Sequence, residues 1–312
     1  WIPGGKFIQG AVPGDTMAKN AEKPAHPVAV DGFFMDATEV TNAQFARFIK
    51  ETGYVTVAER KIDWNELKKQ LPPGTPKPAD SLLQPGSLVF KKTKSSVPNL
   101  YDYSQWWEWK IGANWKHPYG PKSTLEGKEN YPVVQVSYED ALAYCKWAGT
   151  RLPTEAQWEY AARGGMGKSK YTWGNSDKEL SAHANTWEGE FPTTNSKKDG
   201  FEGAAPVRSF PPNKFGLYDM AGNVWEWTQD WYNINYYRDL SEKGMVKNPP
   251  GATKAYNPAS GTSEKIIKGG SYLCNASYCS SYRISARMMS TPDSAHEHVG
   301  FRTVLVPERA QK

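Results

Sequence analysis

Cys274 and Cys279 are the two residues whose type and spacing most strongly suggest chemistry. They lie five positions apart in the segment 268–279, which begins with a lysine and two glycines. Thiolates are soft ligands that bind Cu(I), zinc or iron–sulfur clusters. A structural zinc site needs four ligands, and this segment has neither a second cysteine pair nor flanking histidines. On spacing alone, a low-coordinate Cu(I) site, a redox disulfide, a short structural disulfide loop and two unrelated buried thiols all remain open.

Cys145 is the third cysteine, and it makes the total odd. An odd number excludes a complete disulfide framework and leaves at least one thiol free. Cys145 falls in a stretch that starts at Ser137, ends at Gly149 and has apolar residues at helical spacing. We therefore expect Cys145 to pack in the core on the inner face of a helix.

His296 and His298 form a His-x-His pair in the loop that follows residues 291–294. Alternating histidines can bind copper or iron. We instead expect a solvated loop at this position. The loop is near the cysteine segment, so the two histidines could contact an acidic region of a substrate.

Oxygen donors stand among glycines at three further positions, Asn185, Asp199 and Glu226. Hard cations such as calcium favour carboxylate, amide and carbonyl oxygens. The spacing of these residues is weak evidence for a cation site when taken alone.

Composition limits the classes of partner. The chain has 312 residues, of which 38% are hydrophobic and 13% aromatic, with 27 glycines and 23 prolines. This predicts a turn-rich fold with aromatic packing. The net charge is only +5 and the basic residues are spread among acids, so we expect no nucleic-acid partner. No apolar run approaches about 18 residues, so we expect no membrane span.

Three helices are expected to position these residues. Capping residues and apolar spacing predict helices over 42–52, 138–148 and about 154–164. Residues 60–130 are rich in proline and aromatic side chains, and we interpret them as an extended insertion, favouring an ordered loop that wraps the core. Beyond Gly165, dense turn residues predict short strands and long loops. The sequence thus predicts one domain over residues 1–312, of the α+β class with little regular secondary structure.

Five stretches of the chain resemble the formylglycine-generating enzyme family, also called sulfatase-modifying factors. They cover most of the chain outside the insertion, and the run from Arg151 to Gly165 is highly characteristic. The resemblance implies the formylglycine-generating-enzyme fold, which is C-type-lectin-like. The stretches are residues 1–7, 34–42, 136–165, 215–227 and 269–302.

The cysteines point to the activity, because this fold also hosts iron enzymes, carbohydrate-related modules and maturation factors. Family members that oxidise a substrate cysteine resemble this chain in having both thiols. The resemblance implies a copper-dependent oxidase in which Cys274 and Cys279 hold Cu(I) nearly linearly and leave room for a third sulfur. That sulfur would be the cysteine of a Cys-x-Pro-x-Arg motif in an unfolded sulfatase. Molecular oxygen and a thiol reductant would be consumed as this cysteine becomes Cα-formylglycine.

Three further residues match family positions that line the site. Ser271 and Tyr278 could supply hydrogen bonds near oxygen or substrate, and Trp227 could form part of the wall. A purely structural hydrogen bond or packing role is the alternative for each of them.

Calcium is also implied by the resemblance, as a structural ion that holds irregular backbone. One site would combine side chains with backbone carbonyls over 185–201, and a second would do so over 221–226. The implied ligands are Asn185, Thr186, Asp199 and Phe201 in the first site, and Ala221, Gly222, Val224 and Glu226 in the second.

Two other functions compete with the oxidase. A non-catalytic binding or maturation protein on the same fold would not need Cys274 and Cys279. A mononuclear iron enzyme would need a histidine cluster, and the spacing of His26, His117 and His183 does not provide one.

The chain also departs from the vertebrate pattern. Ala162, Ile284 and Thr303 stand where vertebrate members carry disulfide cysteines, which suggests a prokaryote-like member. The departure removes one argument for an oxidising compartment. The compartment is left open, with an exported one favoured over the cytoplasm.

Overall fold

The three predicted helices begin and end at the residues that cap them. α1 (Asn42–Thr52), α3 (Tyr138–Ala148) and α4 (Glu155–Arg163) each follow a Thr or Ser whose hydroxyl accepts a backbone N–H three residues on. In all three a polar side chain at that third position returns a hydrogen bond, which completes a capping box. Glycines in the left-handed conformation end the helices. The three helix predictions are confirmed.

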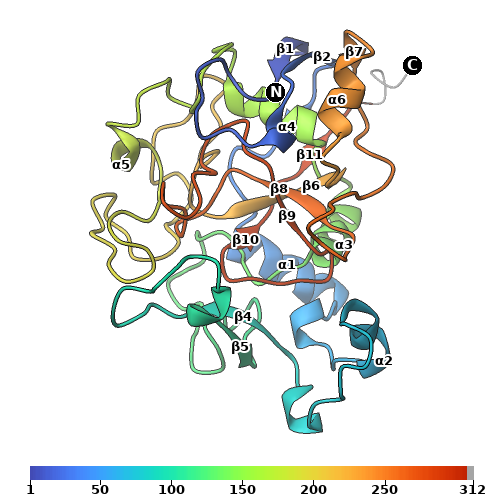
Figure 1. Cartoon of the computed structure of the whole chain (residues 1–312), viewed down its shortest axis with the longest axis vertical. Coiled ribbons are helices and arrows are strands. Elements are labelled where there is room, and N and C mark those ends of the chain that lie inside the picture. The colour runs from blue at the N-terminus through green and yellow to red at the C-terminus, as the bar shows by residue number, and fades with distance from the viewer. Residues whose placement is uncertain (308–312) are drawn as a thin grey trace.

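A four-stranded sheet lies at the centre of the molecule (Figure 1). The computed structural model describes residues 1–307, apart from the side chain of Gln70. The chain leaves the sheet directly into the cysteine segment through Gly270, which has a φ of 76°. A Cβ at Gly270 would lie 2.8 Å from the backbone nitrogen of Tyr282, so this exit requires glycine.

The strand order of the central sheet is β10 (Val299–Gly300), β6 (Trp225–Trp231), β8 (Lys265–Lys268) and β9 (Met288–Ser290), with β10 parallel to β6 and the other pairs antiparallel.

Smaller sheets flank the centre. α4 packs against two strands of the first of them, and the N-terminus lies at this end of the molecule (Figure 1). The first sheet has the order β1 (Gly5–Gln9), β2 (His26–Val30) and β7 (Val246–Lys247), and the second pairs β3 (Phe34–Met35) with β11 (Val304–Leu305).

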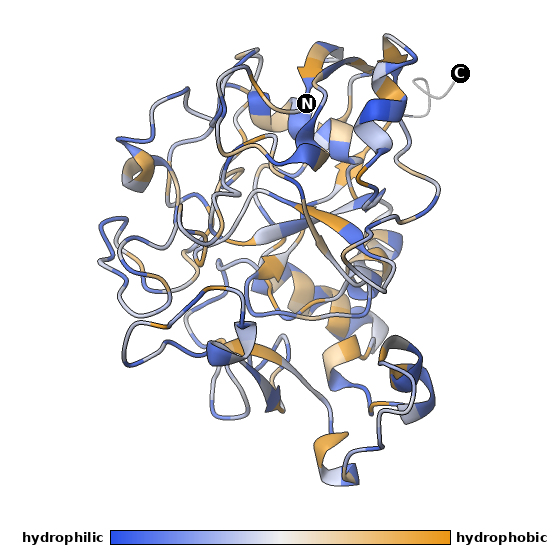
Figure 2. Cartoon of the chain, viewed as in Figure 1, coloured by the Kyte–Doolittle hydropathy of each residue, from blue (hydrophilic) through white to orange (hydrophobic). Residues whose placement is uncertain are grey.

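The largest hydrophobic cluster joins α1 and α3 to the central sheet and is rich in aromatic rings. The ring centroids of Phe45 and Phe48 lie 5.3 Å apart, and Tyr144 stacks on Phe45 at 6.0 Å. Cys145 is buried in this cluster, as predicted, and is a free thiol. Figure 2 shows hydrophobic residues alternating with hydrophilic ones along α1 and α3, as expected of helices with one buried face.

The insertion contains a hairpin that the sequence did not predict. β4 (Gly86–Phe90) pairs antiparallel with β5 (Trp107–Ile111). Burial decreases along β5 without alternating, so the period of two that identifies a half-buried strand is missing. The predicted packing of the aromatic residues is present, because Trp106 is fully buried in a cluster with Trp187 and Phe191. The other short elements of this stretch are η2 (Val57–Glu59), α2 (Trp64–Leu67), η3 (Lys68–Gln70), η4 (Asp80–Leu82) and η5 (Tyr103–Gln105).

The remaining chain consists mostly of loops. Its short helical elements are η1 (Asn20–Glu22), α5 (Leu180–His183) and α6 (Tyr236–Ser241). The mixture of short helices, short strands and long loops is the predicted α+β class with little regular structure. Within residues 1–307, every helix is too short or too polar to span a lipid bilayer.

Candidate active site

Cys274 lies in a tight turn that immediately follows β8. Its backbone N–H donates to the carbonyl of Ser271 at 2.8 Å, and its Sγ accepts the backbone N–H of Ser271 at 3.4 Å. The side chain of Cys274 is only 1% exposed. The turn therefore fixes one thiol at the end of a central strand and shields it from solvent.

Cys279 lies in a second turn that is held to the neighbouring segment 187–189. The backbone N–H groups of Tyr278 and Cys279 both donate to the carbonyl of Asn275, at 3.0 and 2.6 Å. The Asn275 amide donates to the carbonyls of Trp187 and Gly189 at 3.0 and 3.1 Å. Cys279 is partly exposed, so the pair combines one buried and one partly exposed residue.

The two cysteines are free of any disulfide, and a hydrogen bond joins them. Burial raises the pKa of Cys274 well above its usual value, and its bond to Cys279 adds to the rise. Burial also acts to raise the pKa of Cys279, but bonds to Cys274 and Ser281 outweigh it and lower that pKa to about 7. The pair can thus exist as one thiol and one thiolate near neutral pH, a donor set suited to a soft metal.

Ser271 and Trp227, which the resemblance places at the site, both lie in its surroundings. Ser271 is fully buried in the same turn as Cys274. Trp227, on β6, belongs to the hydrophobic cluster that includes Cys274, with Cys279 packed against it. The Trp227 indole donates to the carbonyl of Val136 at 3.1 Å, so its polar atom has a structural partner.

Tyr278 joins the cysteine segment to the insertion. Its ring stacks on Phe191 with centroids 4.3 Å apart, and meets Trp106 edge-on at 5.6 Å. Burial raises the pKa of Tyr278, so its hydroxyl stays protonated. These aromatic contacts hold the residue next to Cys279 against the insertion.

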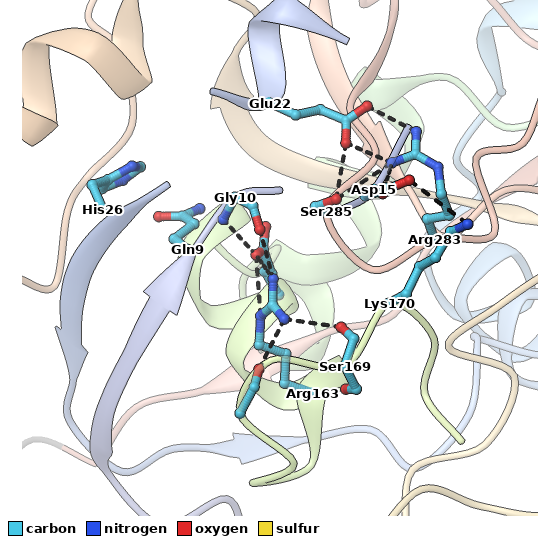
Figure 3. Close-up of polar contacts among 12 residues, drawn as sticks. Gln9, Gly10, Asp15, Glu22, His26, Arg163, Ser169, Lys170, Arg283 and Ser285 are labelled. Atoms are coloured by element: carbon cyan, nitrogen blue, oxygen red, sulfur yellow. Dashed lines mark hydrogen bonds and ion pairs between the residues drawn. The ribbon is translucent and has the colours of Figure 1, made fainter. Parts of the chain in front are cut away.

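A buried ion-pair network links Arg283, which follows the cysteine segment, to Asp15 and Glu22 near the N-terminus (Figure 3). Arg283 donates to Asp15 at 2.8 Å and to both oxygens of Glu22 at 2.7 and 2.8 Å. Ser285 also donates to Glu22 at 2.8 Å. Arginine with two carboxylates in this geometry is among the stronger hydrogen-bonded arrangements in proteins, so it fixes the chain beyond Cys279.

The expected solvated loop at His296 and His298 is wrong. Both side chains are partly buried under the β4–β5 hairpin, where the Trp107 ring lies 6.2 Å from His296 and 4.9 Å from His298. His296 contacts Ser290 at 3.3 Å, and His298 contacts Ser271 at 3.2 Å. The correction follows from the insertion, whose position over this loop is a tertiary contact that local sequence does not reveal.

The first predicted calcium segment forms a compact cradle. Asp199 accepts the backbone N–H groups of Thr186 and Phe201 at 2.9 and 3.0 Å, and Asn185 donates to the carbonyl of Gly203. Glu188, which was not among the predicted ligands, lies near Asp199. Burial raises the pKa of Glu188, and the neighbouring Asp199 carboxylate raises it further.

Two polar atoms of this cradle lack partners. Oγ1 of Thr186 and one carboxylate oxygen of Glu188 are buried without a hydrogen bond among residues 1–307. Burial also raises the pKa of Asp199. Two neighbouring carboxylates and free oxygens fit a hard cation, although the described residues hold no group of three or more metal-binding side chains.

The second predicted calcium segment does not fit a cation in the same way. Glu226 is bidentate with Arg302, at 2.7 Å for each contact, and also accepts the Trp158 indole N–H at 2.7 Å. Gly222 donates to the carbonyl of Gly269 at 2.9 Å, alongside Ala221 and Val224 in the buried turn before β6. Arg302 therefore supplies the positive charge that we expected from calcium.

Several relatives and structures are similar to this chain. The family model described as sulfatase-modifying factor enzyme 1-like domain matches residues 1–306. A formylglycine-generating enzyme of Mycobacterium tuberculosis is 44% identical over 98% of this chain and 97% of its own length, and one of Bos taurus is 43% identical over 96% and 72%. A mouse relative named inactive Cα-formylglycine-generating enzyme 2 is 36% identical over 96% of this chain and 83% of its own.

The fold has a counterpart among solved structures. PvdO of Pseudomonas aeruginosa matches with a TM-score of 0.63 at 22% identity, covering 97% of this chain and 91% of its own. Because identity is low, this likeness concerns the fold alone. The family-model match over residues 1–306 and the 43–44% identical relatives show that the chain belongs to the formylglycine-generating enzyme, or sulfatase-modifying factor, family.

Proposed function

We propose that this protein is a formylglycine-generating oxidase that converts the cysteine of a Cys-x-Pro-x-Arg motif in an unfolded sulfatase to Cα-formylglycine. The observation that carries the proposal is the hydrogen-bonded pair of free thiols, one buried and one partly exposed, at the end of a central strand. Relatives at 43–44% identity that bear the name formylglycine-generating enzyme support it. Molecular oxygen as the oxidant and a thiol as the reductant are part of the proposal.

Cu(I) is the cofactor that the two thiols fit. Within residues 1–307 no third histidine, cysteine or carboxylate joins the two sulfurs in a metal-binding group, and two sulfur ligands suit a low-coordinate soft ion better than tetrahedral zinc. The chemistry that Cu(I) supplies when bound is affinity for a further thiol and redox reactivity toward oxygen. Cys274 and Cys279 would hold it.

The chain's own residues would bind and orient the substrate and exclude water. The substrate cysteine would approach the partly exposed Cys279, while the buried Cys274 keeps its position through the Ser271 turn. Tyr278 and its aromatic neighbours shield the reacting thiol from bulk water. A water-poor site of this kind strengthens every polar contact made to the substrate.

A structural calcium ion at the Asp199 cradle is a second part of the proposal. Its support is the pair of neighbouring carboxylates and the unpartnered oxygens of Thr186 and Glu188. We expect added calcium to raise the thermal midpoint of the wild-type protein and to have a smaller effect on Asp199→Asn. Calorimetry with a calcium titration would measure both, and equal shifts in the two proteins would refute the ion at this cradle.

A non-catalytic binding or maturation protein is the alternative that a specific observation favours. A relative at 36% identity bears a name that calls it inactive, so the fold and much of its sequence can persist without catalysis. The alternative predicts that substrate peptide binds but is never converted, and that Cys274 and Cys279 are dispensable.

Mass spectrometry of a short peptide separates the two proposals. A peptide with Cys-x-Pro-x-Arg is incubated with Cu(I)-loaded protein, oxygen and a thiol reductant, beside a peptide whose proline and arginine are replaced by alanine. The oxidase predicts the mass decrease of a CH2SH group replaced by an aldehyde, in the first peptide above the second. An unchanged mass with retained peptide binding would support the alternative.

A further inference from the structure

The side chain of His298 contacts the turn of residues 271–274, which carries Cys274. Its Nδ1 lies 3.2 Å from Oγ of Ser271, whose backbone N–H is bonded to the sulfur of Cys274. The backbone of His298 is held independently, because its carbonyl accepts the N–H of Trp225 on β6 at 2.8 Å. The side chain can therefore be changed without removing the contact that places the loop.

The direction of the hydrogen bond follows from the partners of Ser271. A hydroxyl has one proton and two lone pairs, and Oγ already accepts the N–H of Leu273 at 3.2 Å. Among residues 1–307, the His298 ring nitrogen is the one other hydrogen-bond partner of this oxygen. Ser271 is fully buried, and a buried donor without an acceptor costs about 1–3 kcal/mol. The hydroxyl proton therefore points to Nδ1, and the imidazole carries its own proton on Nε2.

The surroundings of His298 keep its ring neutral and in place. Burial lowers its pKa well below the usual value, and the neighbouring ring of His296, at 5.9 Å, adds to the effect. The Trp107 ring packs edge-on against it at 4.9 Å. A neutral imidazole has a lone pair free to accept the hydroxyl proton, whereas an imidazolium would not.

We propose that His298 is a positioning residue for the oxidation. It accepts the Ser271 hydroxyl proton, fixes the hydroxyl in one rotamer and leaves the second lone pair of Oγ directed away from the imidazole, available to the reacting groups beside Cys274. This inference rests on the proposed function. It concerns a histidine that lies outside the cysteine segment and acts only through Ser271.

Substitution at His298 tests the inference with a matched control. We expect His298→Ala to lower kcat for the Cys-x-Pro-x-Arg peptide by about 10- to 100-fold, the range seen when a partner of an active-site residue is removed. KM for the peptide and the affinity for Cu(I) should not change. His298→Asn, whose side-chain oxygen can take the place of Nδ1, should restore most of the rate. The control His183→Ala removes a histidine whose ring stacks on Trp173, away from Ser271 and Trp107, and should keep the wild-type kcat.

A double-mutant cycle makes the coupling measurable. If His298 acts through Ser271, the double variant with Ser271→Ala and His298→Ala should be no slower than Ser271→Ala alone. Losses that multiply, or a wild-type rate in His298→Ala, would overturn the inference.

A readout that does not depend on turnover separates this inference from the proposed function. Nitrogen NMR of the His298 ring should show the Nε2–H tautomer in the wild-type protein and a mixture of tautomers in Ser271→Ala. A proton on Nδ1 in the wild type would overturn the contact. If the wild type converts no peptide, the proposed function and the catalytic consequence fail together, and the tautomer still decides whether His298 holds Ser271.

Discussion

Two buried arginines, Arg302 and Arg283, are matched by carboxylates in bidentate contacts. Arg302 binds both oxygens of Glu226, and Arg283 binds both oxygens of Glu22. Burial alone would favour the neutral forms, so each ion depends on its partner. The pairs join residues far apart in the chain, so they hold irregular backbone where strands are few.

Arg302→Met should therefore lower the free energy of unfolding by about 3–5 kcal/mol, because it leaves the buried Glu226 carboxylate with only the Trp158 indole. The matched control is Arg47→Met, which breaks an exposed Arg–Glu pair on α1 and should change stability little. Urea denaturation of both variants measures the difference. Similar losses in the two would contradict the importance of the buried pair.

The loop between β9 and β10 is the element that carries the two histidines. Glu297 stands between them and accepts the Tyr272 hydroxyl at 2.7 Å, while its other oxygen is buried without a partner. Burial raises the pKa of Glu297 to about 8. The carboxyl group is therefore protonated in the folded protein at pH values where the unfolded chain has already lost the proton.

This shift predicts a pH dependence of stability. A raised folded pKa means that the folded state binds the extra proton, so the contribution of Glu297 is full below about pH 4.5 and is lost as the pH rises through about 8. Glu297→Gln keeps an acceptor for Tyr272 and removes the titration. Between pH 5 and pH 8 the variant should lose less free energy of unfolding than the wild type, as measured by denaturant titration at both pH values. An equal loss would show that Glu297 is ionised in the folded protein.

Local signals explain which elements could be predicted. Thr41 and Gly53 define α1 by contacts within the helix itself, so the sequence window contains all the information. The environment of His298 depends on Trp107 and Ser271, which are distant in sequence, and the charge at Glu226 depends on Arg302. Sequence patterns give no sign of those partners. The cysteine pair could be selected from residue type, but the N-terminal loop that binds Arg283 could not.

At the scale of the whole molecule, the insertion is attached to the core by aromatic packing. Trp106 is fully buried between Phe191 and Tyr278, and the neighbouring Trp107 of the hairpin packs against both histidines. The insertion thereby contributes to the wall of the candidate site. We propose that residues 1–312 form one domain in which insertion and core unfold together.

Trp106→Ala tests this attachment. Loss of a buried indole should lower the free energy of unfolding by about 3–5 kcal/mol, with a single transition for the whole protein. Trp106→Phe should cost less, because it retains a ring. Tyr101→Ala, in the same stretch but 87% exposed, should change stability little. Calorimetry that resolved a separate low-temperature transition in Trp106→Ala would show that the insertion folds independently.

The most direct test of the central claim is the rate of aldehyde formation in a Cys-x-Pro-x-Arg peptide by four proteins measured side by side. They are the wild type, Cys274→Ser, Cys279→Ser and Cys145→Ser, each supplied with Cu(I), oxygen and reductant. We predict that either substitution in the pair reduces the rate to near background, whereas Cys145→Ser, a change at a buried thiol on α3, leaves a folded protein with measurable turnover. Wild-type rates in Cys274→Ser or Cys279→Ser would contradict the assignment of the pair as the catalytic centre.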